Sequence, residues 1–345
     1  MSSSVMQEAV NARQVSGGRR VLIWASLGLL QVLFAAYCVT RWYASGEMSP
    51  TPPGPDAMSL PNIVVMWVLQ VIGPGVAVWA IWYFVAKPWR RDGRPSGDGM
   101  LLIACFLIAI PHDILLTYTK PSFSYNSHYV NAGSWLSQVP GIGTPNAHRI
   151  PEPLLLVLPG YAWALFLWAI LGCVVMRAVR RRWPVMPYVG LLAITYISLL
   201  AIDVVFETAL VRFRVMAFTG AVHHFTLWAG TTYQLPIHEV LCWVAFLTAM
   251  TAIRYSRDER GLTFVEQGVD SLRLPTAYRL GLRQLALLGV CTVAITLFYN
   301  LPWQLVSAHD DSFPANMPSY MLNGVCAPPA TVATPQLPPC PGHHG

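Results

Sequence analysis

The stretch Val21–Tyr43, VLIWASLGLLQVLFAAYCVTRWY, is a long apolar run in which Gln31 and Arg41 are the most polar members. A helix needs about 20 mostly apolar residues to cross the hydrocarbon core of a bilayer. A secretory signal peptide has a shorter apolar run, about 7–15 residues, followed by a small-residue cleavage site, which is not evident here. The run therefore predicts a retained transmembrane helix.

Six further stretches repeat this pattern along the chain. Hydrophobic residues make up 54% of the sequence and charged residues only 11%, whereas a soluble domain carries about 25% charged residues. So few charges cannot cover a soluble surface of this size, and we expect an all-α polytopic membrane protein of about seven transmembrane helices. The predicted spans are Val21–Tyr43, Asn62–Ala86, Met100–Tyr118, Pro153–Met176, Val185–Glu207, Leu235–Ile253 and Leu282–Leu301.

The basic residues indicate how these helices are oriented, because cytoplasmic connections are enriched in Lys and Arg. Sixteen of the 22 basic residues lie in the N-terminal segment or in the connections after the second, fourth and sixth spans, and Arg283 lies at the adjoining edge of the last span. We therefore predict a cytoplasmic N-terminus, an outside C-terminus and residence in the bacterial cytoplasmic membrane. The net charge of +6 is then a topology signal, and we expect no nucleic-acid partner. The sequence leaves the oligomeric state open.

The chain is expected to form one transmembrane domain, residues 21–301. We predict a disordered cytoplasmic segment at 1–20 and an outside, Pro-rich tail at 302–345, disordered from about 325. The outside connections 120–152 and 211–234 are expected to be structured, since they are rich in aromatic residues and nearly uncharged. Cys326 and Cys340 lie in the outside tail, where a disulfide can persist. We hypothesise a bridge between them; the alternative is two free thiols.

Charged residues inside the spans mark candidate functional positions, because a charge in the bilayer is costly. Pro111 removes a backbone hydrogen bond from the third span and is expected to kink it beside His112 and Asp113. On the fifth span, Asp203 and Glu207 are four residues apart and share a face. Paired carboxyl groups raise each other's pKa, so that one can stay protonated and act as a general acid.

Two more acidic residues are expected at the same depth. Glu239 lies in the first turn of the sixth span, and Glu152 lies between two prolines at the mouth of the fourth. With the predicted orientation, all of these carboxyl groups fall in the non-cytoplasmic half, and the cytoplasmic half has no comparable set. We therefore predict an acid-bearing polar pocket in that half, with catalytic residues Asp113, Asp203, Glu152 and Glu207.

Simpler roles remain open for some of these residues. Glu207 could meet water beside Arg212 or Arg214, and Glu239 could be favoured in its first turn by the helix dipole alone. Arg149 is close enough in sequence to pair with Glu152. For most of the aromatic residues, packing is the plainer role.

The predicted substrate-binding residues come from the connection 120–152 and from the ends of the spans around it. They are His112, Tyr125, Asn126, His128, Asn131, Trp135, Arg149, Tyr161, His238 and Glu239. The chain has no HExxH, HxxHH, GxSxG or CxxC motif and no phosphate-binding glycine loop. The sequence therefore offers no motif for a metal or a cofactor, and the spiroketal chemistry implied by the family resemblance described next needs neither.

Two segments, YNSHYVNAGSW at Tyr125–Trp135 and RIPEPL at Arg149–Leu154, resemble the AveC-type spirocyclase family. Its members are actinobacterial membrane proteins associated with spiroketal formation in macrolide polyketides such as avermectin. The similarity in size and hydropathy extends over nearly the whole chain. The resemblance implies an enzyme of secondary metabolism that closes a hydrophobic dihydroxy-ketone polyketide to a spiroketal, or dehydrates an alcohol with the same groups. It implies no established catalytic set.

Three other functions fit parts of the pattern. A membrane terpene-type cyclase would use the same carboxyl groups on a polyene and would have a mostly aromatic pocket. A haem- or quinone-binding electron carrier would pair histidines at one depth on facing helices. A non-catalytic lipid-binding or transport protein would carry polar residues through the cytoplasmic half as well.

Overall fold

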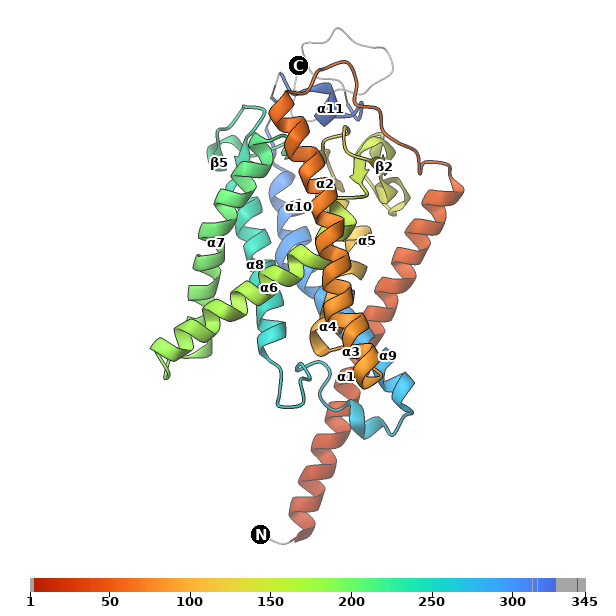
Figure 1. Ribbon diagram of the computed structural model, residues 1–345, viewed down its shortest axis with the longest axis vertical. Helices are drawn as coiled ribbons and strands as arrows, with labels where there is room; N and C mark the ends of the chain where they lie inside the picture. The colour runs from red at the N-terminus through yellow and green to blue at the C-terminus, as the bar shows by residue number, and fades with distance from the viewer. Residues whose placement is uncertain (1–2, 312, 315, 327–339, 341–345) are drawn as a thin grey trace.

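The computed structural model describes residues 3–311, 313–314, 316–326 and 340, with side chains from residue 17 onward. Within these residues, six helices are long and apolar enough to cross a membrane, and a bent pair of helices makes a seventh if the pair is one span (Figure 1). This confirms the prediction of an all-α membrane protein with about seven spans. The spans are Gly17–Ala44, Leu60–Asp92, Val157–Arg182, Tyr188–Arg212, Ile237–Tyr255 and Thr276–Ser307, with Gly97–Leu107 and Ala109–Thr117 as the bent pair.

The first helix, α1 (Ser3–Ala44), begins well before its predicted start at Val21. The described backbone is helical from Ser3, where the sequence predicted disorder over residues 1–20. Gly17 and Gly18 lie against the connection between the sixth and seventh spans, close to Gly268 and Ser271. That connection includes the short helix η6 (Val269–Leu272), so it supports the extended part of α1.

Two spans pass through a π-helical turn next to a proline. The second span comprises α2 (Leu60–Ile81), η1 (Trp82–Ala86) and α3 (Lys87–Asp92). Pro88 has no N–H for the Phe84 carbonyl, which accepts a hydrogen bond from Ser96 Oγ at 2.7 Å instead. The last span comprises α9 (Thr276–Ile295), η7 (Thr296–Asn300) and α10 (Leu301–Ser307), so it extends beyond its predicted end at Leu301.

The third span is broken as predicted at Pro111. It consists of α4 (Gly97–Leu107), α5 (Ala109–His112) and η2 (Asp113–Thr117), and its two parts are bent by 52°. Ile110 leaves the helical region, with φ −101° and ψ 122°, as a residue before proline tends to do. Its carbonyl accepts a hydrogen bond from Gln31 Nε2 at 2.8 Å. The bend places Asp113 at the start of a new helical turn.

The remaining spans are α6 (Val157–Arg182), α7 (Tyr188–Arg212) and α8 (Ile237–Tyr255). The outside connections carry the short helices η3 (Trp135–Gln138), η4 (Ala147–Arg149) and η5 (His223–Phe225). They also carry three antiparallel strand pairs, β1 (Ser124–Tyr125) with β4 (Met216–Ala217), β2 (Asn131–Gly133) with β3 (Pro151–Pro153), and β5 (Thr226–Leu227) with β6 (Leu235–Pro236). Because Pro151–Pro153 pairs with β2, the fourth span begins at Val157 rather than at Pro153.

α1 and α9 pack with their backbones in close contact. A Cβ atom at Gly28 would overlap the Leu285 carbonyl, and one at Gly289 would overlap the Trp24 carbonyl. Glycines permit this approach because they have no side chain, a common device where helices meet inside a membrane. The contact joins the first and last spans.

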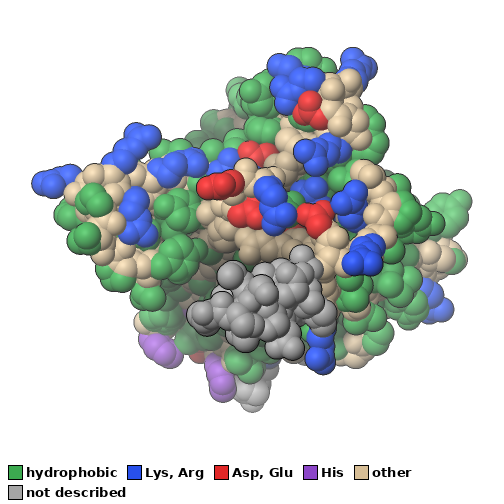
Figure 2. All heavy atoms as spheres, turned by 90° about the horizontal axis from the view of Figure 1, so that it is seen from below, with side chains coloured by type: hydrophobic (Ala, Val, Ile, Leu, Met, Phe, Trp, Pro, Cys, Tyr) green, Lys and Arg blue, Asp and Glu red, His purple; other side chains and the backbone are tan. Residues whose placement is uncertain are grey.

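The basic connections gather at the end of the molecule that carries the N-terminus. Figure 2 shows this face, with Lys and Arg side chains along its rim and acidic side chains between them. Arg254 and Arg257 both pair there with Asp98, and Arg283 pairs with Glu266 at 2.8 Å. The grouping agrees with the predicted topology, and the side of the membrane that this end faces stays a prediction.

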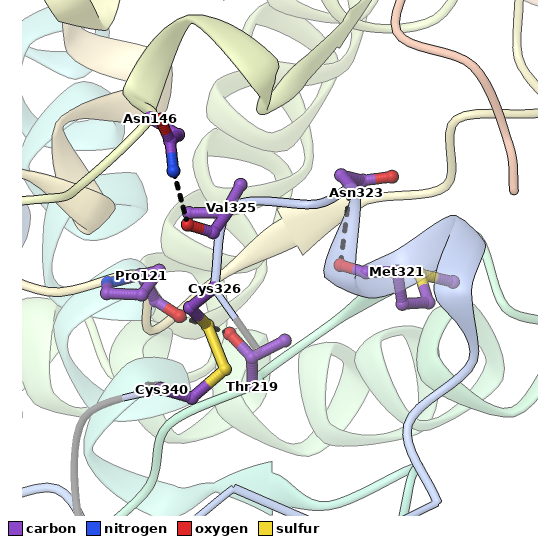
Figure 3. The surroundings of a disulfide bond; sticks show 8 residues. All are labelled: Pro121, Asn146, Thr219, Met321, Asn323, Val325, Cys326 and Cys340. Carbon is purple, nitrogen blue, oxygen red and sulfur yellow. Dashed lines mark hydrogen bonds between the residues drawn. A yellow bond between two sulfur atoms is a disulfide. The ribbon is translucent and has the colours of Figure 1, made fainter. Parts of the chain in front are cut away.

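The chain after α10 folds back over the outside connections and includes α11 (Ser319–Leu322). The bridge expected between Cys326 and Cys340 is present, with the two Cα atoms 4.9 Å apart (Figure 3). Next to it, Asn146 Nδ2 donates to the Val325 carbonyl at 3.1 Å. The disorder predicted from about residue 325 falls mostly on 327–339 and 341–345, which lie outside the described residues.

Candidate functional site

Asp113 and Glu152 meet beneath the outside connections. Asp113 is the first residue of η2, directly after the bend in the third span. Glu152 is the middle residue of β3, opposite Ala132 in β2, with a proline on each side. The two residues are 5% and 0% exposed, and the Asp113 carboxyl is close enough to Glu152 to act on it electrostatically.

Two phenol groups contact this carboxyl pair. The Tyr125 hydroxyl donates to Asp113 Oδ1 at 3.0 Å, and strand pairing of Tyr125 with Met216 holds it in place. Tyr161, in the second turn of α6, is also close enough to Asp113 to interact with it electrostatically. Three segments that are separate in sequence thus converge on the pair.

The environment of Glu152 favours its protonated form. Burial, and then the neighbouring Asp113 carboxyl, raise the pKa of Glu152 well above its usual value. Neither oxygen of Glu152 has a hydrogen-bond partner among the described residues, nor has Asp113 Oδ2. Two neighbouring buried carboxyl groups do not both ionise readily, because each negative charge disfavours the other.

A second group of carboxyls lies between α7 and α8. Asp203 and Glu207 are both buried on one face of α7, together with Leu199 and Val211, as their spacing predicted. They interact electrostatically with each other and with Glu239 in the first turn of α8. The Tyr299 hydroxyl, from the π turn of the last span, donates to Glu239 Oε1 at 2.9 Å.

Tyr299 interacts electrostatically with Glu239 and Glu207 of the second group and with Tyr161, the neighbour of the first group. We call the whole set the acid cluster; its carboxyl side chains are between 0% and 5% exposed. Sequence reasoning missed Tyr299, which has no charge and stands in an apolar span beside Asn300. The acid cluster consists of Asp113, Glu152, Asp203, Glu207 and Glu239 with Tyr125, Tyr161 and Tyr299.

The arginines near the second group are engaged elsewhere. The Arg212 guanidinium lies 3.7 Å from the centroid of the Tyr233 ring and 4.7 Å from that of Trp228. Arg214 donates to Thr232. The structure therefore differs from the alternative in which Glu207 meets water beside one of these arginines: Glu207 is buried, and the arginines have other partners.

His112 lies outside the acid cluster, although it is adjacent to Asp113 in sequence. Its Nδ1 is 2.9 Å from Asn300 Oδ1, and its Nε2 is 3.2 Å from Gln31 Oε1. These contacts tie the bend of the third span to the first and last spans. His112 thus links three spans through its side chain, and its role in binding substrate stays a prediction.

Several other predicted binding residues shape the connection itself. Asn126 accepts a hydrogen bond from the His128 N–H at 2.9 Å and donates to the Arg214 carbonyl at 2.8 Å. Asn131 Nδ2 donates to the carbonyls of Ser127 and Tyr129 at 2.8 and 2.9 Å. Both amides satisfy buried backbone groups that a folded loop must otherwise leave unpaired.

Arg149 does not pair with Glu152. Its Nε donates instead to the Asn323 carbonyl at 3.2 Å, because the chain after α10 returns beside η4. The pairing of Arg149 with Glu152 was expected because they are close in sequence. A contact with a distant part of the chain replaces it.

The predicted aromatic and histidine contacts are spread around the cluster. Trp135 is fully buried against Trp42, with ring centroids 5.5 Å apart, and the His128 ring lies 5.2 Å from that of Tyr320. His238 stands next to Glu239 and packs 4.7 Å from the Trp303 ring. Both His238 nitrogens are buried without a hydrogen-bond partner among the described residues.

A family model described as spirocyclase AveC-like matches residues 89–321, a range that holds every member of the acid cluster. The comparisons with curated proteins and with solved structures each found no match. The matched range is well over half of the chain. The chain therefore belongs to the AveC-like spirocyclase family, whose name denotes cyclases of the kind used in polyketide biosynthesis.

Proposed function

We propose that this chain is a membrane-embedded cyclase that forms a spiroketal from a dihydroxy-ketone polyketide intermediate by acid catalysis, without a cofactor. The observation that carries the proposal is the acid cluster. None of its five carboxyl groups forms an ion pair with Lys or Arg among the described residues. A set of buried carboxyl groups without a cation can hold protons at neutral pH.

The reaction needs such protons at one step. One hydroxyl of the substrate first adds to the ketone and gives a hemiketal. An acid then protonates the hemiketal hydroxyl, the C–O bond breaks, and water leaves with both bonding electrons. The second hydroxyl attacks the resulting oxocarbenium ion, and its proton returns to the carboxylate. The net change is the loss of one water molecule, so no oxidant or reductant is required.

We infer that Asp113 and Glu152 act as one proton-sharing pair. The protonated member supplies the acid, and the ionised member then faces the developing cation, which a nearby negative charge stabilises. Asp203, Glu207 and Glu239 provide a second acid group, so either group can serve as donor while the other accepts. The three phenols are placed to position the ketone and the hydroxyls of the substrate.

The proposal is tested with purified protein in lipid nanodiscs, a synthetic dihydroxy-ketone, and no added cofactor. We expect faster loss of water than in protein-free nanodiscs, with one stereoisomer of the spiroketal in excess. Asp113→Asn, Glu152→Gln and Asp203→Asn keep the side-chain shape and remove the acid. Each should lower kcat by about 10²–10⁴-fold, the usual contribution of general acid–base catalysis.

Asp310→Asn is the matched control. Asp310 is also buried, at 8% exposed, but it accepts a hydrogen bond from Ser122 at 2.5 Å and lies outside the acid cluster. Its amide variant should keep wild-type turnover. Product identical in rate and stereochemistry to the protein-free reaction would overturn the proposal.

A further inference from the structure

A cavity of about 420 Å³ lies among the basic connections, at the end of the molecule that Figure 2 shows. Its lining comes from the connection after α3, from the connection between α8 and α9, and from the first two turns of α9. Four of the lining side chains are arginines and one is acidic: Arg94, Arg260, Arg279, Arg283 and Asp270. A cavity lined mainly by one sign of charge attracts ligands of the opposite sign, so this one favours an anion.

The sequence of α9 places two of these arginines. Thr276, Arg279 and Arg283 are three and four residues apart, so they share one face of the first two turns, and all three line the cavity. The connection between α8 and α9 folds over the same face. Asp270 in that connection pairs with Arg279 at 3.0 Å and with Arg260 at 3.2 Å.

The ion pairs of the lining leave one positive charge over. Three carboxylates pair with the lining arginines, and these are Asp258, Asp270 and Glu266. They balance three of the four guanidinium charges. Arg94 forms no ion pair within the part of the chain that the structure describes. A ligand with one negative charge would therefore neutralise the lining.

The N-terminus of α9 adds to this positive charge. Its N-cap residue is Pro275, and no side chain caps the helix there. The first N–H groups of a helix have no partner within the helix, and they carry a partial positive charge of about half an elementary charge. Thr276, the first residue of α9, lines the cavity. Guanidinium groups and a helix N-terminus are the two protein groups that suit a phosphate best.

Apolar side chains complete the lining and favour an amphipathic ligand. They are Leu262, Val269 and Leu280, and α9 continues from the cavity into the last apolar span. The cavity thus lies at the level where phospholipid headgroups meet the helix ends, on the side predicted to be cytoplasmic. Basic pockets between helices on that side of a membrane bind anionic headgroups, and a phosphodiester carries the single negative charge that the lining lacks.

We propose that this cavity binds the phosphate group of an anionic phospholipid, with Arg94 as its main charged partner. Topology requires basic residues on one side of the membrane, but it does not require arginines from separate connections to share one cavity. Like charges brought together repel each other unless an anion balances them. The bound headgroup links the connection after α3 to the start of α9, and this role is independent of the reaction proposed above.

The first test titrates delipidated protein in non-ionic detergent with dioctanoyl phosphatidylglycerol, which has one negative charge, and with zwitterionic dioctanoyl phosphatidylcholine. Native mass spectrometry counts the bound lipid. We expect one phosphatidylglycerol to bind about tenfold more tightly than phosphatidylcholine, with a smaller preference at high salt. Arg94→Gln should weaken its binding about fivefold, because a partly exposed charged donor is lost. Arg90→Gln is the matched control, since Arg90 is exposed at the same end but does not line the cavity.

A second pair of variants adds a carboxylate instead of removing an arginine. Thr276→Glu places a negative charge in the cavity, where it competes with the phosphate. An acidic residue in a first helical turn stabilises the helix, so this variant should fold and lose the preference for phosphatidylglycerol. Ala277→Glu carries the same charge in the same turn, but residue 277 does not line the cavity, and it should keep the preference.

Inorganic phosphate distinguishes the two sources of the phosphate group, and at equal concentration it should not displace the lipid. Displacement by inorganic phosphate, with both lipids binding alike, would support a phosphate site and overturn the lipid as its ligand. Equal weakening by Arg90→Gln and Arg94→Gln would mean a diffuse surface charge and would overturn the site. Equal affinity for both lipids without any effect of phosphate would overturn it as well.

Discussion

Tyr299 is the member of the acid cluster that sequence reasoning missed. Its hydroxyl donates to Glu239, and it interacts electrostatically with Glu207 and Tyr161. In sequence it is one more aromatic residue in an apolar span. Its importance comes from its neighbours, and it was visible only after the last span had been placed against α6 and α8.

Tyr299→Phe removes this hydrogen bond and keeps the ring. We expect kcat to fall about tenfold, because Glu239 loses its hydrogen-bond donor, while KM stays close to that of the wild type. The pH profile of kcat should also shift, since the Tyr299 hydrogen bond favours the ionised form of Glu239 and the variant loses it. Steady-state kinetics across pH would show this, with the exposed Tyr83→Phe as control; a purely structural role would leave the profile in place.

Asp310 gives a prediction for stability against pH. Burial raises the pKa of Asp310 from 3.8 to about 7, against the opposing hydrogen bond from Ser122. The folded protein thus keeps a proton that the unfolded chain releases, so this residue makes stability fall as pH rises from about 4 to 7. Above that window it costs on the order of 1–3 kcal/mol after discounting for partial exposure.

Asp310→Asn should therefore unfold at a higher temperature than the wild type at pH 8, with little difference at pH 4. Thermal unfolding followed by tryptophan fluorescence in detergent would measure both. Parallel curves for the two proteins across this range would contradict the assignment.

At the scale of elements, two features organise the site: the bend of the third span and the strand pair β2–β3. The bend turns Asp113 inward, and the strand pair holds Glu152 above it. The kink followed from Pro111 alone, because proline acts on its own helix. The strand pairing needed Asn131–Gly133 to meet Pro151–Pro153 across a long connection, and no local pattern specified that register.

The close contact of α1 and α9 predicts a sharp effect of side-chain size. Gly28→Leu would place its Cβ on the Leu285 carbonyl, so the helices must separate. We expect a loss of about 1–3 kcal/mol, as for other overpacked sites. Gly75→Leu on α2 is the matched control, since a Cβ there has open space around it; equal unfolding temperatures for both variants would refute the contact.

At the scale of the whole molecule, the two ends of the helix bundle differ in charge and in the structure of their connections. One end gathers the basic connections and their ion pairs, and the other holds the folded outside connections and the Cys326–Cys340 bridge. The acid cluster lies toward the second end. This division agrees with a cytoplasmic N-terminus, because basic connections are retained inside and a disulfide persists outside.

Reporter fusions would test that orientation. Alkaline phosphatase is active only outside the cytoplasm, so a fusion after Ser307 should be active and one after Arg181 inactive. A green fluorescent protein reporter at the same positions should give the opposite pattern. Activity at Arg181 and none at Ser307 would reverse the predicted topology.

The sequence by itself determined the membrane class, the approximate spans, the kink at Pro111 and the group of acidic residues in one half. These follow from the length of apolar runs, the direction of each helix and the distribution of Arg, all of which are local properties of the chain. The tertiary structure alone decided that Asp113 lies near Glu152, that Tyr299 donates to Glu239, and that Arg149 donates to Asn323. Such contacts depend on the rotation of each helix and the register of each loop, which distant parts of the chain fix together when they pack.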